Sequence, residues 1–499
     1  MKHLTALLLA VLLLLTACGV EVPTSSPSEP STDVNQEETP PPEPVPFTLA
    51  IYPEFSLHPV LAANRTNLTL APLLYESLFT VDASFQAQPL LCRSFDFRLD
   101  DMRLWSFTLH EGITFSDGTP LTAKEAADAL NLARSPGSRY QERLSDIDSI
   151  TASEEDPYEF IITLRSSNGS LPLLLDIPIA LGREDRPVGT GPYVLSEDGT
   201  ALTARPDWWQ REKSLPASDI LLRAVTRSDE LIYAFDAGDI SLVDVDLMAT
   251  NAMGYGGNYQ TWDYPTTDFL YLGFNTQTGV FRSAAARRAA SLAVDRDTIA
   301  SAIYANHAIP TLLPVHPASN LYQPVEEPLA YNPEGLAAQM EALRLQGSAL
   351  VFVVNSENVA KTSAAQLIAY QLRAAGFSVD LRQLPFEDYT AALTRRDFDL
   401  YLAETVLPAD YNLFPLLYHE LNYGGWQAQD AVIRLLDLHG ESEDRQSRAN
   451  QLFELLDEEA PIVPILFKNG SVLTQWGQLS GLSPVRNNVF YQLENWTVK

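Results

Sequence analysis

The sequence predicts an α/β fold, and three observations lead to that prediction. The first is a regular alternation of strand and helix patterns between residues 349 and 403. The strands are expected at Ala349–Val354, Ser378–Leu384 and Asp399–Ala403, and the helices at Ala360–Ala375 and Tyr389–Arg395. Segments of these lengths in this order are typical of a parallel sheet covered by helices.

The second observation is a strand, a turn and a capped helix within residues 105–133. Apolar side chains alternate with polar ones over residues 105–109, which is the period of a half-buried strand. Asp117-Gly118 supplies turn chemistry, because glycine tolerates the positive φ of a tight reversal. Thr122 lies three residues before Glu125, and this capping-box spacing predicts that a helix begins there.

The third observation is size and composition. The chain has 499 residues, of which 46% are hydrophobic and 10% aromatic, so it can form two or three domains with a large core. Further strands are expected at Phe47–Tyr52, Phe160–Leu164 and Phe269–Asn275, and further helices at Leu68–Phe79 and Phe281–Ile299.

The charge balance excludes two classes of partner. The chain has 33 Lys and Arg against 64 Asp and Glu, a formal net charge of −31 at pH 7. A field of this sign repels nucleic acids and anionic lipid headgroups, so we expect neither as a partner. It attracts cationic or zwitterionic ligands only weakly, because salt screens surface charge within about 10 Å.

The amino terminus carries an export signal. Lys2 precedes an apolar run at residues 4–15, which is shorter than the roughly 20 residues of a membrane-spanning helix. The run leads into the letters LTAC, ending at Cys18, which resemble the bacterial lipobox. In that signal the cysteine is lipidated and becomes the new amino terminus, and two acyl chains anchor a protein stably. Cleavage at an ordinary small-residue site is the alternative.

Residues 19–46 are expected to form a tether. They contain eight prolines, six acidic residues and no Lys or Arg, a composition that stays extended and cannot bury a core. Because Cys18 belongs to the export signal, Cys92 has no cysteine left for an internal disulfide. We expect Cys92 to be a buried small hydrophobic residue.

Residues 105–123 read WSFTLHEGITFSDGTPLTA, which resembles the fingerprint of the family 5 extracellular solute-binding proteins, the peptide- and nickel-binding components of ABC importers. Further segments resemble motifs of the same family. They are YESL from Tyr75, GTGPY from Gly189, DWW from Asp207, a helix-then-strand segment from Glu230, RRAA from Arg287 and APIVP from Ala460. The resemblance extends from about Phe47 to Trp496.

The resemblance implies a two-lobed periplasmic-binding-protein-like fold of type II, with the extra subdomain of the peptide-binding group. The expected boundaries are 1–18 for the signal peptide and lipobox, 19–46 for the tether, 47–65 with 187–268 and 477–499 for lobe I, 66–186 for the extra subdomain of lobe I, and 269–476 for lobe II.

The resemblance also implies a lipid-anchored binding protein on the outer face of the bacterial cytoplasmic membrane. Such a protein captures short peptides by lobe closure and delivers them to an ABC permease. We expect a monomer without cofactor or resident metal, and no catalytic activity, because the sequence contains no HExxH, GxSxG, P-loop or CxxC motif. Another solute (nickel chelate, haem, an opine or an oligosaccharide) and a ligand-sensing receptor remain open alternatives.

Peptide-binding relatives pair the ligand's ammonium with an Asp after a late strand, and that region here reads AETVLPADYN. The resemblance makes Asp410, with Asn412 beside it, the candidate anchor, and Glu404 is a second acid that could take the role. A buried ammonium needs such a partner, because an uncompensated buried charge costs several kcal/mol. A helix or turn cap is the structural alternative for Asp410.

Three aromatic residues are candidates for ligand contact. Tyr423 and Trp426 lie in the glycine-rich segment NYGGW, and Tyr75 opens the segment YESL. Tyr423 and Trp426 could stack on ligand side chains or pack under their loop, and Tyr75 could face the cleft or the core.

Overall fold

The computed structural model describes residues 46–499 apart from 99–100, 251–253, 325–328, 428–429 and 431–444. The predicted export signal, Cys18 and residues 19–45 of the predicted tether lie outside the described residues. In the described part of the chain, none of the helices is both long and apolar enough to cross a bilayer.

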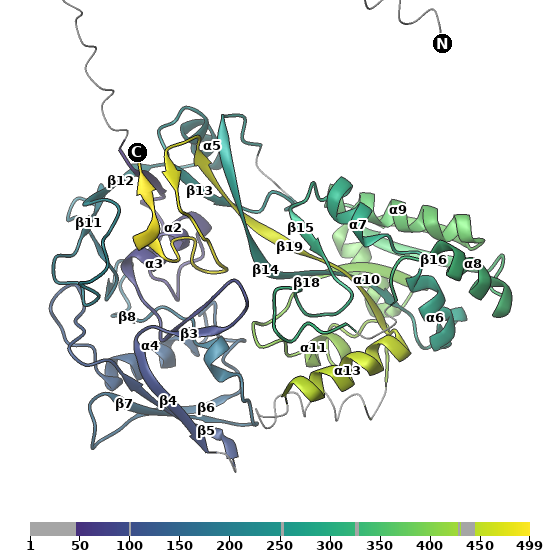
Figure 1. Cartoon of the computed structure of the whole chain (residues 1–499), viewed down its shortest axis with the longest axis horizontal. Coiled ribbons are helices and arrows are strands. Elements are labelled where there is room, and N and C mark those ends of the chain that lie inside the picture. Colours follow the sequence, from purple (N-terminus) through teal and green to yellow (C-terminus); the bar gives the residue numbers. More distant parts are fainter. Residues whose placement is uncertain (1–45, 99–100, 251–253, 325–328, 428–429, 431–444) are drawn as a thin grey trace, which may run out of the picture. The chain divides into compact units, whose positions relative to one another are not determined.

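A seven-stranded sheet contributes the largest core (Figure 1). Its order is β13-β19-β14-β18-β16-β17, and β15 also pairs with β19. The strands are β13 (Leu242–Val245), β14 (Tyr259–Phe274), β15 (Ala308–Pro310), β16 (Ala349–Asn355), β17 (Ser378–Leu384), β18 (Leu400–Val406) and β19 (Ile462–Gln475). β16 runs parallel to β17 and β18, as predicted, whereas β14 pairs antiparallel with β18 and β19. The sheet is therefore mixed rather than wholly parallel.

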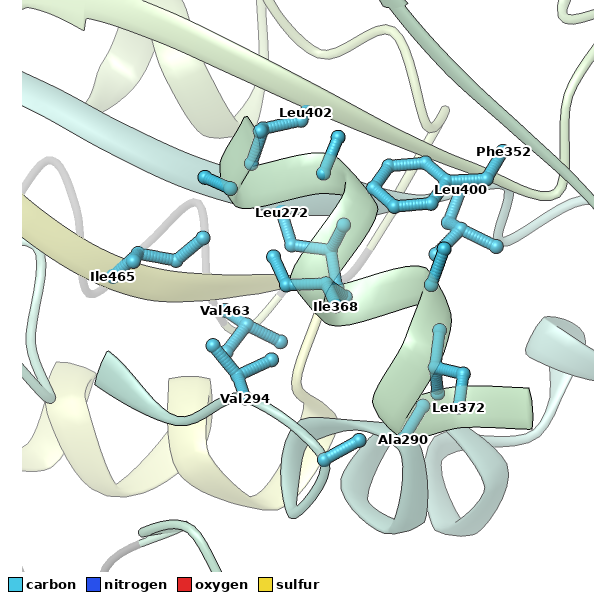
Figure 2. Close-up of a cluster of buried hydrophobic side chains, with 14 of the residues drawn as sticks. Leu272, Ala290, Val294, Phe352, Ile368, Leu372, Leu400, Leu402, Val463 and Ile465 are labelled. Atoms are coloured by element: carbon cyan, nitrogen blue, oxygen red, sulfur yellow. The ribbon is translucent and has the colours of Figure 1, made fainter. Parts of the chain in front are cut away.

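Helices cover both faces of this sheet. One face carries α6 (Ala284–Ser291), α8 (Pro333–Ala342) and α9 (Val359–Ala375), and the other α10 (Phe386–Arg395), α11 (Phe414–Leu417) and α13 (Arg445–Glu459). Figure 2 shows Ile368 of α9 in one cluster with Phe352 and Leu400 of the sheet. The next residue along each strand, Val353 and Tyr401, belongs to the opposite cluster. Side-chain alternation along the strands thus gives the sheet two buried faces.

Two four-stranded sheets lie elsewhere in the chain. The first has the order β1-β12-β11-β10 and the second β4-β5-β7-β6. Their strands are β1 (Thr48–Ile51), β4 (Cys92–Arg98), β5 (Asp101–Leu109), β6 (Ile147–Ala152), β7 (Glu159–Leu164), β10 (Tyr193–Leu195), β11 (Ala201–Ala204) and β12 (Asp219–Ala224). The remaining described strands form pairs: β2 (Phe79–Val81) with β3 (Ala87–Pro89), β8 (Ala180–Leu181) with β9 (Val188–Gly189), and β20 (Leu479–Ser480) with β21 (Thr497–Val498).

The predicted capping box is confirmed. Helix α4 (Ala123–Ala133) begins after Thr122, whose hydroxyl accepts the Lys124 N–H at 3.3 Å. The Glu125 carboxylate in turn accepts the Thr122 N–H at 3.1 Å. Two amides that the first helical turn leaves without partners are therefore satisfied.

Two predicted helices were wrong in extent. The helix expected at Leu68–Phe79 is split into α2 (Arg65–Thr69) and α3 (Ala71–Leu74), because Pro72 has no N–H to continue α2. The helix expected at Phe281–Ile299 is α6 followed by α7 (Arg296–Thr298) and a π-helical turn at Ile299–Ile303. There Asp295 starts a new helix by accepting the Thr298 N–H at 3.1 Å.

Glu76 is a buried carboxylate whose hydrogen bonds are met within the fold. It is 5% exposed and accepts N–H groups from three consecutive residues. The donors are the indoles of Trp208 (3.2 Å) and Trp209 (2.8 Å) and the amide of Gln210 (3.1 Å). The segments YESL and DWW are therefore in direct contact, and the contact is structural.

Strand β14 connects two of the cores. Tyr264, near its middle, packs in the cluster that contains the β1-β12 sheet, while Phe274, at its end, packs in the cluster around α9. The predicted boundary between lobe I and lobe II, at residues 268 and 269, falls inside this strand. Helix α5 (Ser228–Asp236) precedes β13 and completes the predicted helix-then-strand segment.

Candidate functional site

Two neighbouring cavities form the candidate site. The first has a volume of about 740 Å³, within the range typical of small-molecule sites, and the second about 470 Å³. The first is lined by segments that include residues 59–71 and 137–141, the strands β13, β14 and β19, and residues 486–489. The second lies where β16 and β18 end and α9 begins. Val406, the last residue of β18, lines both cavities and is 61% exposed.

Lys468 is surrounded by three carboxylates beside these cavities. Its Nζ lies 2.7 Å from Glu404 Oε1, 3.0 Å from Asp246 Oδ2 and 3.8 Å from Asp268 Oδ2. The Lys468 side chain is 5% exposed. Burial opposes its charge, but Glu404 and Asp246 raise the pKa of Lys468 well above its usual value. One ammonium therefore serves three carboxylates, and we call these four residues the Lys468 cluster.

Asp268 is the least engaged carboxylate of the Lys468 cluster. Its side chain is 30% exposed, against 18% for Asp246 and 22% for Glu404, and it lines the larger cavity. Burial raises the pKa of Asp268, and the neighbouring acids raise it further. A cationic group of a ligand in the cavity would relieve this excess of negative charge.

Another acid of the larger cavity is already neutralised. Asp244 accepts the Tyr264 hydroxyl at 2.7 Å and forms an ion pair with Arg65 at 3.4 Å. Asp244 is thus paired with Arg65 at the wall of the larger cavity and carries no excess charge for a ligand.

The guanidinium groups of Arg139 and Arg486 lie on the same cavity, and Arg143 lies close to Arg139. Arg139 stacks over the Tyr140 ring with its Cζ 5.2 Å from the ring centroid, and Arg143 lies 5.7 Å from the same centroid. Arg143 forms an ion pair with Asp176, whose other oxygen accepts the Asn487 amide at 2.9 Å. Arg486, next to Asn487, also lines the cavity.

The second cavity has polar groups without partners. Asn355 is 6% exposed, and its Oδ1 accepts no hydrogen bond among the described residues. The Lys361 ammonium likewise makes no hydrogen bond or ion pair with the described part of the chain, and burial lowers its pKa. Residues 404–406 of β18 line this cavity and pair with β14 but not with β16 in the described structure. This cavity therefore combines an open strand edge with donor and acceptor side chains.

The structure places the predicted anchors in different surroundings. Glu404 lines the second cavity. Asp410 is 2% exposed and is not among the residues that line either cavity. Its Oδ2 accepts the Asn168 amide at 3.1 Å and its Oδ1 accepts the Asn412 N–H at 3.2 Å. Arg445 donates to the Asp410 carbonyl at 2.9 Å.

The residues around Asp410 join the extra subdomain to the seven-stranded sheet. Tyr411 has a positive φ of 54°, unusual for a bulky side chain, and is 1% exposed. Phe85, at the tip of the β2–β3 hairpin, lies 5.8 Å from the Tyr411 ring and 5.0 Å from the His316 ring. Asn168 and Phe85 both belong to residues 66–186, so these two residues connect that segment with residues 269–476.

The remaining predicted site residues pack against protein. Asn412 Oδ1 accepts the Phe414 N–H at 3.0 Å. Tyr423 lies edge-on to Tyr401 at 6.0 Å, and Trp426 is 6% exposed in the same cluster. Tyr75 is 3% exposed, and its hydroxyl donates to the Pro187 carbonyl at 3.1 Å. The structure brings Asp410 and Asn412 together, but Glu404 and Tyr75 lie elsewhere.

Sequence reasoning missed Asp246, Asp268, Lys468 and Arg486. A signal existed for one of them: Lys468 interrupts an apolar run from Ile462 to Phe467 in a strand that is buried along most of its length. A buried lysine in such a run predicts a carboxylate partner. Within the described residues, no three side chains of His, Cys, Asp or Glu are arranged to hold a metal ion.

Comparison with known proteins shows which family the chain is related to. The profile of the bacterial extracellular solute-binding proteins, family 5 (middle region), matches residues 86–425, more than half of the chain. The chain is 26% identical to Protein XP55 of Streptomyces lividans over 444 residues, covering 76% of this chain and 77% of that protein. It is 21% identical over 471 residues to the oligopeptide-binding protein AppA of Bacillus subtilis, covering 85% and 86%.

Solved structures share the fold. AppA of Bacillus subtilis in complex with a nonapeptide matches with a TM-score of 0.59 at 18% identity, over 91% of this chain and 98% of that chain. NikA of Brucella suis in complex with Fe(III)-EDTA matches with a TM-score of 0.69 at 19% identity, over 91% and 99%. The predicted two-lobed fold is confirmed.

Proposed function

The chain belongs to the bacterial extracellular solute-binding proteins of family 5, and from that premise we propose that it captures short peptides between its two lobes and delivers them to an ABC permease. It does so without catalysis and as a monomer. The observation that carries the proposal is a pair of adjoining cavities, with charged side chains of both signs and an open strand edge.

The open edge of β18 supports a peptide in particular. An extended peptide can add to a strand edge through backbone hydrogen bonds, which are independent of its side chains. Residues 404–406 offer such an edge beside the second cavity, and the shared wall at Val406 leads into the first. AppA of Bacillus subtilis, a relative that matches 85% of this chain, carries the name of an oligopeptide-binding protein.

Two carboxylates remain candidates for the peptide's ammonium. Glu404 lines the second cavity and belongs to the Lys468 cluster, which has more acids than bases. Asp410 lies in the segment ADYN and is 2% exposed, with Asn168 as its partner. Cavity lining supports Glu404, whereas the sequence resemblance supports Asp410 and would require that Asn168 move away.

Titration of short peptides with free and N-acetylated amino ends tests both anchors. Glu404→Gln and Asp410→Asn keep the shape and the hydrogen-bond acceptor but remove the charge. We expect the variant of the true anchor to lose about 10- to 100-fold in affinity for free-amine peptides and little for acetylated ones. Asp397→Asn, in an exposed pair with Arg395, is the matched control. Equal losses for both kinds of peptide would show that neither acid is the anchor.

Mass spectrometry of ligand co-purified with the wild-type chain tests the solute class directly. Short peptides would support the proposal. A metal chelate, to which the match with NikA points, would replace the peptide by another solute in the same fold. A haem, opine or oligosaccharide would do the same. Genetic loss of peptide uptake in a deletion strain separates transport from a sensing role.

We further propose that lipidated Cys18 anchors the protein at the outer face of the cytoplasmic membrane, with residues 19–46 as the tether. The support is the LTAC segment and the composition that follows it. In Cys18→Ala the protein should leave the membrane fraction while retaining peptide binding. Membrane retention of this variant would contradict the proposal.

A further inference from the structure

His316 lies at a contact between two distant parts of the chain. Its ring centroid is 5.0 Å from that of Phe85, at the tip of the β2–β3 hairpin, and 5.2 Å from that of Phe467 in β19. Phe85 belongs to the extra subdomain predicted at residues 66–186, whereas His316 and Phe467 belong to lobe II, predicted at 269–476. The hairpin therefore covers the imidazole from the other lobe, and His316 is 3% exposed.

The hydrogen bonds of His316 fix its neutral form. Nδ1 accepts the Ala318 N–H at 3.0 Å, so the ring hydrogen is on Nε2. Nε2 is buried and has no hydrogen-bond partner in the part of the chain that the structure describes. A second proton could bind only at Nδ1, where it would oppose the Ala318 N–H and break that bond. Protonation would therefore cost one hydrogen bond and place an unpaired charge in the contact.

The charged groups around His316 do not compensate such a charge. The described segments that surround it carry two acids and three bases, which are Asp82, Asp410, Arg445, Lys468 and Arg486. Both acids are occupied by hydrogen bonds, and none of the five forms an ion pair with His316. Tyr411, whose hydroxyl accepts the His316 N–H at 3.3 Å, stays neutral because burial raises its pKa. Burial likewise lowers the pKa of His316 to about 4.

We propose that His316 is a proton-sensitive latch, whose protonation releases the Phe85 hairpin and shifts the two lobes toward the open form. In the open form water reaches the imidazole, so its pKa returns toward the ordinary value of about 6.5. The open form therefore binds a proton more readily than the closed form does. The closed fraction is largest above pH 6.5 and falls as the pH drops toward 4. The inference goes beyond the proposed function, because the shift does not depend on which solute binds.

Scattering from the ligand-free chain tests the latch directly. Small-angle X-ray scattering at pH 7 and pH 5 measures the radius of gyration, while far-UV circular dichroism checks that the chain stays folded. We expect the ratio of open to closed molecules to rise by about 10- to 30-fold between these pH values, and the radius of gyration to increase with it. Identical scattering profiles at the two pH values would overturn the proposal.

Variants assign the response to His316. His316→Phe keeps a ring between Phe85 and Phe467 but binds no proton, so its radius of gyration should not change with pH. Phe85→Ala exposes His316 in both forms and should also lose the response. Because this substitution lies at the tip of a hairpin, it stays informative even where His316→Phe is unstable. His419→Asn, which removes an exposed histidine paired with Glu420, should respond like the wild type. A pH response retained in His316→Phe and Phe85→Ala would overturn the inference.

Discussion

Glu76 and the Lys468 cluster are two ways to bury negative charge in one chain. Glu76 accepts three N–H groups from Trp208, Trp209 and Gln210 and needs no counter-ion. The Lys468 cluster does the opposite: three carboxylates share one ammonium, and they face cavities. The comparison teaches that hydrogen bonds alone can satisfy a buried acid, whereas the carboxylates of the Lys468 cluster leave excess negative charge at a cavity wall.

The largest expected effect on stability comes from replacing Glu76, the buried acid whose hydrogen bonds are all met. Glu76→Ala leaves two indole N–H groups and one amide buried without an acceptor, so it should destabilise the chain by about 3–5 kcal/mol. Urea unfolding measures this loss. Glu76→Gln, which keeps one acceptor oxygen, should lose less. If Glu76→Ala instead weakened peptide binding while the unfolding free energy stayed unchanged, Glu76 would belong with the ligand-facing acids.

A buried titratable group without a counter-ion extends the comparison. His316 is 3% exposed, its Nδ1 accepts the Ala318 N–H at 3.0 Å, and burial lowers its pKa to about 4. The unfolded chain binds a proton near pH 6.5, so between pH 6.5 and 4 it holds more protons than the folded chain. Stability from neutral His316 is therefore full above pH 6.5 and falls by about 2–3 kcal/mol as the pH drops to 4.

Unfolding free energies measured across that pH range check the His316 prediction. His316→Asn keeps an acceptor near Ala318 but does not titrate, so its stability should fall less steeply with acidification. Parallel curves for the two proteins would assign the acid sensitivity to other groups.

Lys468→Met tests the Lys468 cluster, in which three carboxylates share one ammonium. Without the ammonium, Glu404, Asp246 and Asp268 repel one another, but their partial exposure keeps them hydrated. We expect a loss of about 1–2 kcal/mol at neutral pH, smaller than for Glu76→Ala. Part of the loss should return at low pH as the carboxylates protonate. Unfolding at pH 7 and pH 4 distinguishes this from simple loss of packing, which would not depend on pH.

The smallest effect is expected for an exposed pair. Arg395 lies 2.8 Å from Asp397, with the two side chains 65% and 57% exposed. Arg395→Gln should change the unfolding free energy by less than about 1 kcal/mol, because water and salt screen exposed charges. A larger loss would mean that the number of ion pairs governs stability in this chain, rather than the burial of charged groups and the completeness of their hydrogen bonds.

Local patterns predicted much of this structure. The helix α9 follows from its apolar periodicity, and the start of α4 follows from Thr122 and Glu125, because both depend on residues within one or two turns. Cys92 is buried as predicted, and burial raises its pKa to about 12.

The Lys468 cluster could not be predicted in the same way. Its members lie at positions 246, 268, 404 and 468, after β13, within β14 and β18, and within β19. Only the antiparallel register of these long strands brings them together, and that register depends on the tertiary fold. The mixed sheet has the same origin, since alternation from residue 349 onward carries no information about β14 and β19.

The position of Phe85 has a consequence for motion. Its ring is 3% exposed because it packs against His316 and Tyr411, which lie far along the chain. Opening of the lobes would expose the Phe85 ring to water, at a free-energy cost of about 2–3 kcal/mol. It would also break the hydrogen bond between Asn168 and Asp410. The ligand-free protein should therefore populate the closed state for part of the time. Ligand binding would then depend on how often the lobes open spontaneously.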